Sequence, residues 1–382
     1  MSGLGFMERL LDGAAVEWVP LGEVIKLEKG RQLNKELLSV DGLYPAYNGG
    51  ISYSGFTDSY NYTENKTIIS QGGASAGFVN FVTTKFYANA HCYVLVPNLG
   101  RVQNRYVFHL LKLNERKLTE SQHGAGIPAL RTSEITSILI PIPCPDDPKK
   151  SLAIQAEIVR ILDAFTELTA ELTAELGARK KQYKHYRDQL LSFDGKDVEW
   201  KTLGDPNFFE IANSARRPVK ASLREAGDIP YYGANNIQDY VAGHTHQGEY
   251  VLIAEDGSAS IENYSVQYTN GRFWANNHVH VIRGAQNVSS KYLFYYLSTA
   301  KFTPFLTGGG RAKLTKGSLL EIPIPIPPIA EQARIVAILD RFDTLTSSLS
   351  EGLPREIALR QKQYEYYRDL LLNFPKPAEV AP

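Results

Sequence analysis

The stretch Glu-Ile-Val-Arg-Ile-Leu-Asp at residues 157–163 returns as Ala-Arg-Ile-Val-Ala-Ile-Leu-Asp at residues 333–340. Further out, Val16-Glu17-Trp18 returns as Val198-Glu199-Trp200, and Lys181-Gln182-Tyr183 returns as Lys362-Gln363-Tyr364. These phrases lie about 180 residues apart, far more than the roughly 20–50 residues of a solenoid repeat. The sequence therefore predicts a duplicated domain with an approximate internal two-fold axis.

Each half is predicted to be a mixed domain followed by a long helix. Short apolar runs at 67–69, 78–82 and 91–96, with counterparts at 250–253, 265–268 and 279–282, favour strands. Residues 106–113 and 292–298 favour short helices. The segments 140–143 and 322–328 are expected to be extended edges, because proline cannot donate to a sheet ladder. The expected fold is α+β: two mixed domains related by pseudo-two-fold symmetry and separated by two long antiparallel helices.

The predicted boundaries follow these segments. They are 1–150 for the first mixed domain with its N-terminal segment, 151–193 for the first long helix, 194–329 for the second mixed domain, and 330–382 for the second long helix and C-terminal tail. The phrase that follows the first helix also opens the chain, so the two ends are expected to lie close together.

The two long helices carry apolar residues every three or four positions, from Ile154 to Phe193 and from Ile335 to Phe374. An amphipathic helix often covers only its own domain. However, about 40 residues at 1.5 Å each reach roughly 60 Å, so we expect the two helices also to pack on each other. Gly352-Leu353-Pro354 predicts a break in the second helix, which restarts with Pro354 in its first turn.

Composition indicates a globular protein without a membrane span or signal peptide, and the cytoplasm is the expected location. The two cysteines are too few for a disulfide framework. The net charge is zero, yet residues 65–114 and 263–320 contain no Asp or Glu while retaining Lys and Arg. These windows favour a surface that tolerates phosphate; the alternative is that they are mostly buried strands.

The sequence lacks the motifs of a self-sufficient enzyme. It has no Gly-rich loop ending in Gly-Lys-Ser/Thr and no Asn-Pro-Pro-aromatic motif of an amino-methyltransferase. The pairs His244/His246 and His278/His280 have no Cys or acidic partner at metal-ligand spacing. We therefore expect no catalytic residue, cofactor site or metal site on this chain.

The repeated helices carry a resemblance. The phrases at 157–163 and 333–340, the paired segments 179–193 and 360–374, and the tandem Thr-Ala-Glu-Leu at 169–176 resemble the DNA specificity subunits of type I restriction-modification systems, particularly the type IC-like group. The resemblance implies that each mixed domain is a target-recognition domain for one half of a bipartite site in double-stranded DNA. It implies that the helices set the gap and dock two methyltransferase subunits, with motor-nuclease subunits joining the full complex. S-adenosylmethionine, ATP and Mg²⁺ would belong to those partners.

Two other classes are weighed against this one. A self-contained DNA-modifying enzyme is disfavoured by the missing motifs. A pseudo-symmetric scaffold or carbohydrate-binding protein, with Tyr and Trp as stacking platforms, predicts no salt-sensitive affinity for DNA.

Candidate site residues follow from polar turns and repeated tyrosines. Amides, aromatics and arginines in turns suit base and phosphate contacts, and the set chosen for DNA is Tyr47, Asn48, Gln71, Ser75, Gln122, His123, Arg216, Arg217, Tyr232, Asn235, Asn236, Ser258, Arg311 and Lys313. The set chosen for partner docking is Tyr183, Tyr186, Arg187, Tyr364, Tyr367 and Arg368. Some of these tyrosines must instead serve the helix pairing.

Overall fold

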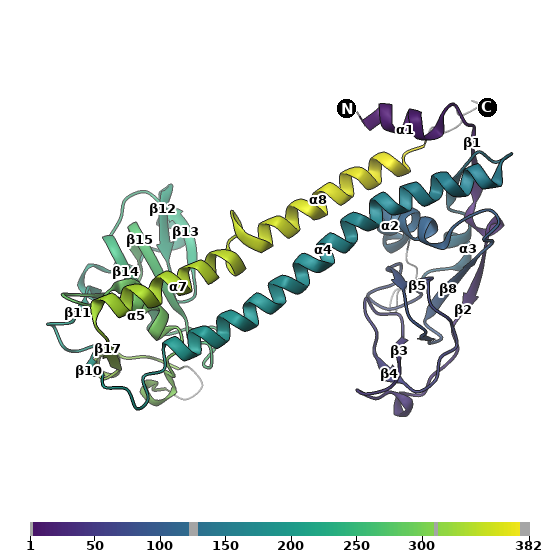
Figure 1. Cartoon of the computed structure of the whole chain (residues 1–382). Coiled ribbons are helices and arrows are strands. Elements are labelled where there is room, and N and C mark those ends of the chain that lie inside the picture. Colours follow the sequence, from purple (N-terminus) through teal and green to yellow (C-terminus); the bar gives the residue numbers. More distant parts are fainter. Residues whose placement is uncertain (1–2, 122–128, 309–311, 375–382) are drawn as a thin grey trace. The chain divides into compact units, whose positions relative to one another are not determined.

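A computed structural model of the chain describes residues 3–121, 129–308 and 312–374. It forms two compact units (Figure 1). One unit comprises residues 1–172 with 357–382, and the other comprises residues 173–356. Each unit therefore contains one mixed domain and parts of both long helical segments.

The first mixed domain is built on a four-stranded antiparallel sheet in the order β2 (Ile25–Lys29), β8 (Cys92–Pro97), β5 (Lys66–Ser70), β6 (Val79–Val82). A three-stranded sheet contains β4 (Gly55–Thr57), β3 (Tyr44–Tyr47) and β7 (Tyr87–Ala88). Helix α2 (Asn104–Glu120) buries Tyr106 and Leu111 in one apolar cluster with Ile69 and Leu95 of the main sheet. The domain also contains α1 (Gly3–Leu11) and α3 (Thr132–Thr136).

The second mixed domain has a six-stranded sheet in the order β11 (Phe209–Ile211), β16 (Val279–Gly284), β14 (His246–Ala254), β15 (Val266–Ala275), β12 (Ala226–Tyr232), β13 (Ile237–Val241). Helices α5 (Ser290–Leu297) and α6 (Lys316–Leu320) complete it. The β12 and β15 strands pair in parallel, as β3 and β7 do in the first domain. This shared feature supports the duplication read from the sequence.

The proline-rich segments form edge strands, as predicted. Among the described residues, β9 (Leu139–Pro143) in the first half pairs only with β1 (Val16–Pro20), and β17 (Pro323–Ile326) in the second pairs only with β10 (Glu199–Thr202). The predicted short helix at 106–113 proved longer. It continues to Glu120 because ion pairs Lys112–Glu115 and Arg116–Glu120 support a polar last turn.

The long segments are α4 (Pro148–Leu190), α7 (Ile329–Ser347) and α8 (Gly352–Leu372). The expected break is confirmed, although it lies at residues 348–351, just before Gly352 rather than at 352–354. The helices α7 and α8 are separate, and Pro354 lies in the first turn of α8. In the second unit Tyr186 of α4 stacks on Phe342 of α7, while Leu190 and Ile338 line the same groove. Residue numbers rise along one helix as they fall along the other, so the pairing is antiparallel.

The two chain ends meet within the first unit. Met7 and Leu11 of α1 share an apolar cluster with Leu371, Leu372 and Phe374 at the end of α8. This contact confirms the expected proximity of the ends. The second unit has an equivalent apolar cluster. There Leu191 and Phe193, which follow α4, cluster with Ile335 and Leu339 of α7.

Each mixed domain is attached to its helix by a matched polar junction. In the first unit Asp163 of α4 pairs with Arg105 at 2.8 Å and with His109 Nε2 at 2.8 Å. In the second unit Asp340 of α7 pairs with Lys291 at 3.3 Å and accepts a hydrogen bond from Tyr295 at 2.5 Å. The two junctions differ chiefly in one residue. His109, which can titrate near neutral pH, stands in the first unit where Tyr295 stands in the second.

The neutral form of His109 fits its junction. Its Nε2–H donates to Asp163 Oδ1, and its Nδ1 accepts from the Tyr364 hydroxyl at 3.1 Å. Burial lowers the pKa of His109, and this effect outweighs the Asp163 carboxylate, which would raise it. Burial alone would raise the pKa of Asp163, but His109 and Arg105 outweigh it and the pKa is lowered.

Replacing His109 by Gln is expected to flatten the pH dependence of stability. Because the folded pKa lies below the ordinary value near 6.5, the unfolded chain binds more protons as pH falls through that value, and the folded state loses stability. Glutamine keeps one donor and one acceptor but does not titrate. Between pH 7.5 and pH 5.5 the melting temperature of the native chain should therefore fall further than that of His109→Gln, by about 2 °C. Equal falls in the two proteins would rule out this role for His109.

Candidate functional site

In the first domain the predicted DNA-contact residues that the structure describes lie at two adjacent turns. Tyr47 ends β3, and the exposed Asn48 follows it. The Gln71 backbone N–H donates to the His91 carbonyl at 2.8 Å, and the Ser70 hydroxyl donates to the Gly50 carbonyl at 3.1 Å. The Ser70 bond ties the turn at 48–50 to the start of the turn at 71–75, which carries Ser75, and the Gln71 bond ties that second turn to the residue before β8.

Glycine is required where these two turns approach the start of β8. Gly49 has a φ of 79°, and a Cβ there would lie 2.9 Å from the His91 carbonyl oxygen. The Tyr47 ring is half-buried, edge-on to Tyr53 and Phe86, and burial raises the pKa of its hydroxyl. Asn48 is therefore the more accessible of the two side chains.

The second domain brings together the equivalent turns. Asn235 Nδ2 donates to the Gly257 carbonyl at 2.8 Å, and Asn235 Oδ1 accepts from the Ala259 N–H at 2.7 Å. The Ser258 hydroxyl donates to the Ser260 carbonyl at 2.8 Å. The side-chain oxygen of the exposed Asn236 accepts from the next backbone N–H, that of Ile237, at 2.8 Å. A single polar surface thus contains the turn at 233–236 and the loop at 256–260.

Charged residues beside this loop meet at Glu255. Arg216 Nη1 lies 2.7 Å from one carboxylate oxygen, and Lys313 Nζ lies 3.3 Å from the other. Burial alone would raise the pKa of Glu255, but the hydrogen bond from Arg216 and the other nearby positive groups outweigh it, and the pKa is lowered. Arg216 also donates to the Val279 carbonyl at 2.7 Å, so its guanidinium holds the loop in place. Lys313 is the more exposed cation, with 46% of its side chain accessible.

The other predicted DNA-contact residues are placed differently. Tyr232 is buried, edge-on to Phe273, and so supports the surface from behind. Arg217 is exposed, and its carbonyl accepts from the Trp274 indole at 2.7 Å. Gln122, His123 and Arg311 lie outside the described residues.

The sequence-based selection omitted two exposed histidines beside these turns. His91 immediately precedes β8 and its carbonyl accepts from the Gln71 N–H, and His278 lies 2.6 Å from Asp256. The repeated Ala-Asn-x-His phrase was the available signal. By contrast, His246 and His280 are buried and bonded to the Ala212 and Leu314 carbonyls, which gives them structural roles.

The tyrosines proposed for docking fall into an inner and an outer pair. Tyr183 and Tyr364 pack inside their units, and burial raises the pKa of both hydroxyls, that of Tyr364 to about 12. Tyr186 and Tyr367 each stack one ring face on a phenylalanine yet remain 39% and 37% exposed. The outer pair is therefore available to a partner.

Arg187 and Arg368 occupy equivalent positions beside the inner pair. Arg187 lies over the Tyr183 ring at 5.9 Å and pairs with Asp188 at 3.0 Å. Arg368 lies over the Tyr364 ring at 5.8 Å and pairs with Asp369 at 2.7 Å. Both arginines are thus held against the helix face, and part of each charged side chain remains accessible at the surface.

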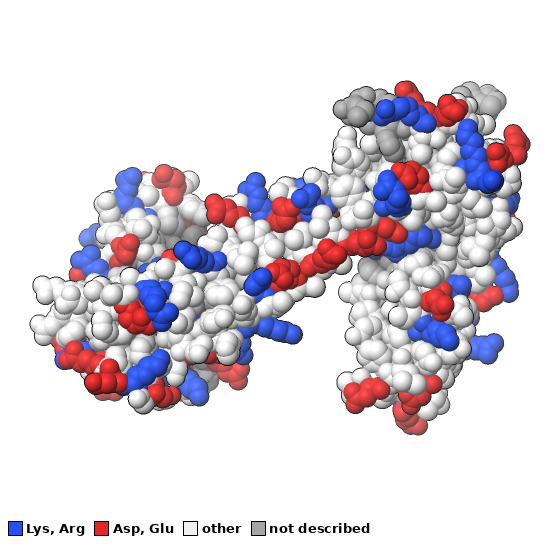
Figure 2. Space-filling model, viewed as in Figure 1, with Lys and Arg blue, Asp and Glu red and all other residues white. Residues whose placement is uncertain are grey.

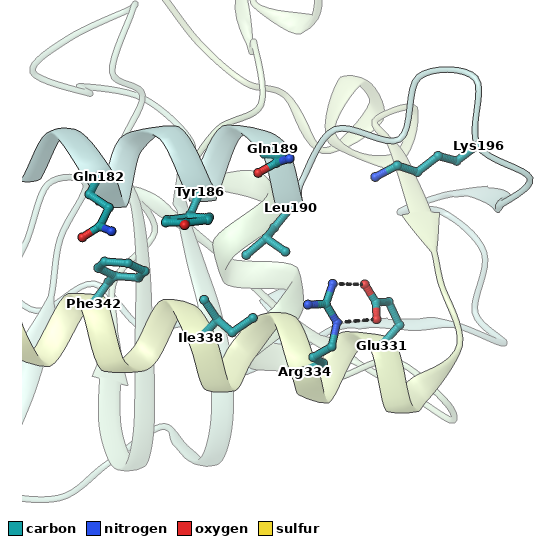
Figure 3. A pocket seen from close by; sticks show the side chains of 9 residues that line it. All are labelled: Gln182, Tyr186, Gln189, Leu190, Lys196, Glu331, Arg334, Ile338 and Phe342. Carbon is teal, nitrogen blue, oxygen red and sulfur yellow. Dashed lines mark hydrogen bonds and ion pairs between the residues drawn. The ribbon is translucent and has the colours of Figure 1, made fainter. Parts of the chain in front are cut away.

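A groove of about 590 Å³ opens beside Tyr186 in the second unit (Figure 3). Leu190, Ile338 and Phe342 form its apolar floor. Arg334 and Glu331 form a two-bond ion pair at its rim, each bond 2.7 Å long. In the first unit a groove of about 920 Å³ is lined by α2, the β1–β9 ribbon and the end of α8, including Trp18, Leu113 and Leu372.

Charges are interspersed rather than concentrated on the face shown in Figure 2. A row of acidic side chains follows the middle of α4, where Glu167, Glu171 and Glu175 recur at four-residue spacing. Among the described residues there is no group of three or more His, Cys, Asp or Glu placed to hold a metal ion. Over the same ranges, no helix is long and apolar enough to cross a membrane.

Comparisons with known proteins agree on one family. The model of the "type I restriction modification DNA specificity domain" matches residues 15–179 and again 195–359. The specificity subunit of the Escherichia coli type I restriction enzymes EcoR124I and EcoR124II is 38% identical, with 100% of both chains covered. A putative type I restriction enzyme specificity subunit of Haemophilus influenzae is 55% identical over 52% of each chain.

Solved structures share the fold. The S subunit of a type I restriction-modification system from M. genitalium superposes with a TM-score of 0.69 at 19% identity, covering 96% of this chain and 98% of that one. A chain from a structural study of assembly and conformational transition in the type I system gives a TM-score of 0.53 at 18% identity, covering 94% and 97%. These likenesses confirm the α+β architecture with two duplicated domains.

Proposed function

Because this chain belongs to the type I restriction-modification DNA specificity family, we propose that it is a specificity subunit whose two mixed domains each read half of a bipartite site in double-stranded DNA. The observation that carries the proposal is that the family model matches once on each half. Family membership sets aside the scaffold, carbohydrate-binding and self-contained enzyme alternatives.

The reading surface of each half is the pair of adjacent turns. The residues are 48–50 with 71–75 in the first domain, and 233–236 with 256–260 in the second. Exposed amides such as Asn48 and Asn236 suit bidentate hydrogen bonds to base edges in the major groove. Lys313 suits a phosphate, whereas Arg216 and Tyr232 hold the surface in shape.

The helical segments serve as spacer and as dock. The acidic row on α4 would repel phosphate, which favours DNA on the domains rather than on that face. We assign the outer tyrosines Tyr186 and Tyr367, with Arg187 and Arg368, to the interface with two methyltransferase subunits. Motor-nuclease subunits would join this core in the full complex.

The chain contributes recognition and no catalytic group to the proposed complex. Methyl transfer needs S-adenosylmethionine, and DNA translocation and cleavage need ATP and Mg²⁺. We assign all three to the partner subunits.

Removing the Lys313 ammonium group is expected to weaken binding to every DNA duplex alike. In the complex with methyltransferase subunits, log affinity falls as log salt rises, and Lys313→Ala should make this slope less steep. The expected change is about 0.9, the value for one phosphate contact. Asn236→Ala should instead cost about 1–3 kcal/mol on the target site and little on unrelated DNA. Lys180→Ala, an exposed lysine on α4, is the matched control and should change neither. Unchanged affinity of Lys313→Ala at low and moderate salt would remove Lys313 from the surface.

A further inference from the structure

Two equivalent ring contacts fix the register of the helical segments, one within each unit. Phe165 stacks on Tyr367 with ring centroids 5.0 Å apart, and Phe342 stacks on Tyr186 at 5.7 Å. The residue number advances by 21 from Phe165 to Tyr186 along α4, but by 25 from Phe342 to Tyr367 along α7 and α8. The second segment therefore holds four more residues than the first between equivalent contacts.

Those four residues correspond to the loop 348–351 that separates α7 from α8. The loop folds back on the last turns of α7. Gly352 has a φ of 76°, and a Cβ there would lie 2.3 Å from the Thr344 carbonyl oxygen. The Ser348 hydroxyl accepts from the Glu351 N–H at 3.1 Å, which closes the loop into a turn. Leu349, the one large apolar side chain of the loop, is 86% exposed and therefore contributes little burial to the folded loop.

The loop contributes almost no length along the helix axis. Gly352 lies against the last turns of α7, close to the Thr344 carbonyl oxygen. The chain from Ser347 to Gly352 therefore advances little along α7, although it would span about 16 Å if extended. Roughly 15 Å of length is held in the folded loop.

A helix through the loop is disfavoured. Pro354 has no N–H for the Ser350 carbonyl, which instead accepts from Arg355 Nη1 at 2.5 Å. Gly352 also lowers helix stability. A longer α4 should therefore draw the loop out rather than convert it to helix.

We propose that residues 348–351 form an expansion joint that determines which spacer lengths the protein tolerates. The proposal rests on the proposed role of the helices in setting the gap. Each added Thr-Ala-Glu-Leu copy lengthens α4 by about 6 Å. Two copies, about 12 Å, fall within the length held in the loop, and three, about 18 Å, exceed it.

A graded insertion series tests the joint in the full chain. One, two or three Thr-Ala-Glu-Leu copies are inserted after Leu176, and the melting temperature is measured without DNA. The first two copies should each lower it by less than about 3 °C, and the third should lower it by about 10 °C, because a ring contact or helix end is then lost. An equal decrement at each copy would overturn the proposal.

A variant without the joint provides the matched control. This variant lacks residues 348–351 and carries Gly352→Ala and Pro354→Ala. Its second helical segment then has the same number of residues between the ring contacts as α4 has. One inserted copy should lower the melting temperature of this variant by about 10 °C, against less than about 3 °C in the native chain. Equal losses in both backgrounds would also overturn the joint. If the gap between the DNA half-sites stayed the same after the insertion, the spacer role of the helices would be refuted. The melting temperatures test the expansion joint separately from that role.

Discussion

Glutamate at both Tyr186 and Tyr367 is expected to abolish copurification of the methyltransferase subunits. These tyrosines remain 39% and 37% exposed. Each ring stacks on a phenylalanine, Tyr186 on Phe342 and Tyr367 on Phe165, and also carries a polar hydroxyl group. A carboxylate buried without a partner at each interface would cost about 3 kcal/mol, which weakens association on the order of 100-fold per site.

Two controls separate the interface from the fold. Tyr186→Phe with Tyr367→Phe keeps both ring stacks and should retain most of the binding. Tyr366→Glu places the same charge one residue away on α8, at a side chain that is 61% exposed, and should leave the complex intact. Circular dichroism should match the native chain for every variant. A stoichiometric complex with the double glutamate variant would contradict the docking assignment.

The architecture was predictable because its signals are local. Repeated phrases give the duplication, prolines at 140–143 and 322–328 confine those segments to sheet edges, and Gly352 with Pro354 ends a helix. The four-residue excess in the second segment is also countable from the sequence. Its placement in one folded loop is not, because that depends on how the chain turns back on α7.

The candidate site was less predictable because side-chain partners come from distant segments. Arg216 has the sequence context of a DNA-binding arginine, but its guanidinium pairs with Glu255, which follows β14 and is 39 positions away in the chain. Tyr232 lies in a polar turn sequence yet faces the core beside Phe273. The pairing of His109 with Asp163 likewise joins α2 to α4, and no spacing in the sequence indicates it.

Insertion of one Thr-Ala-Glu-Leu copy after Leu176 is expected to move the two DNA half-sites apart. Four residues add about 6 Å of rise and one turn plus roughly 40° to α4. The rise corresponds to nearly two base pairs at about 3.4 Å each, whereas the extra rotation matches only one at about 10.5 base pairs per turn. The gap should therefore grow by one or two base pairs.

The native site should then be lost as a substrate. A complex built for the longer gap cannot place both reading surfaces on the original half-sites, so methylation of the native site should fall to background. Replacing Thr173-Ala174-Glu175-Leu176 by four alanines is the matched control, since it changes the same turn of α4 without changing its length. That variant should keep the native gap.

Mapping every methylated site by long-read sequencing of DNA from cells that express the chain with its methyltransferase tests the central claim most directly. For the native chain the account predicts a bipartite sequence with one fixed gap. For the insertion variant it predicts the same two half-site sequences, separated by one or two more base pairs. An unchanged gap, or altered bases within either half-site, would contradict the account.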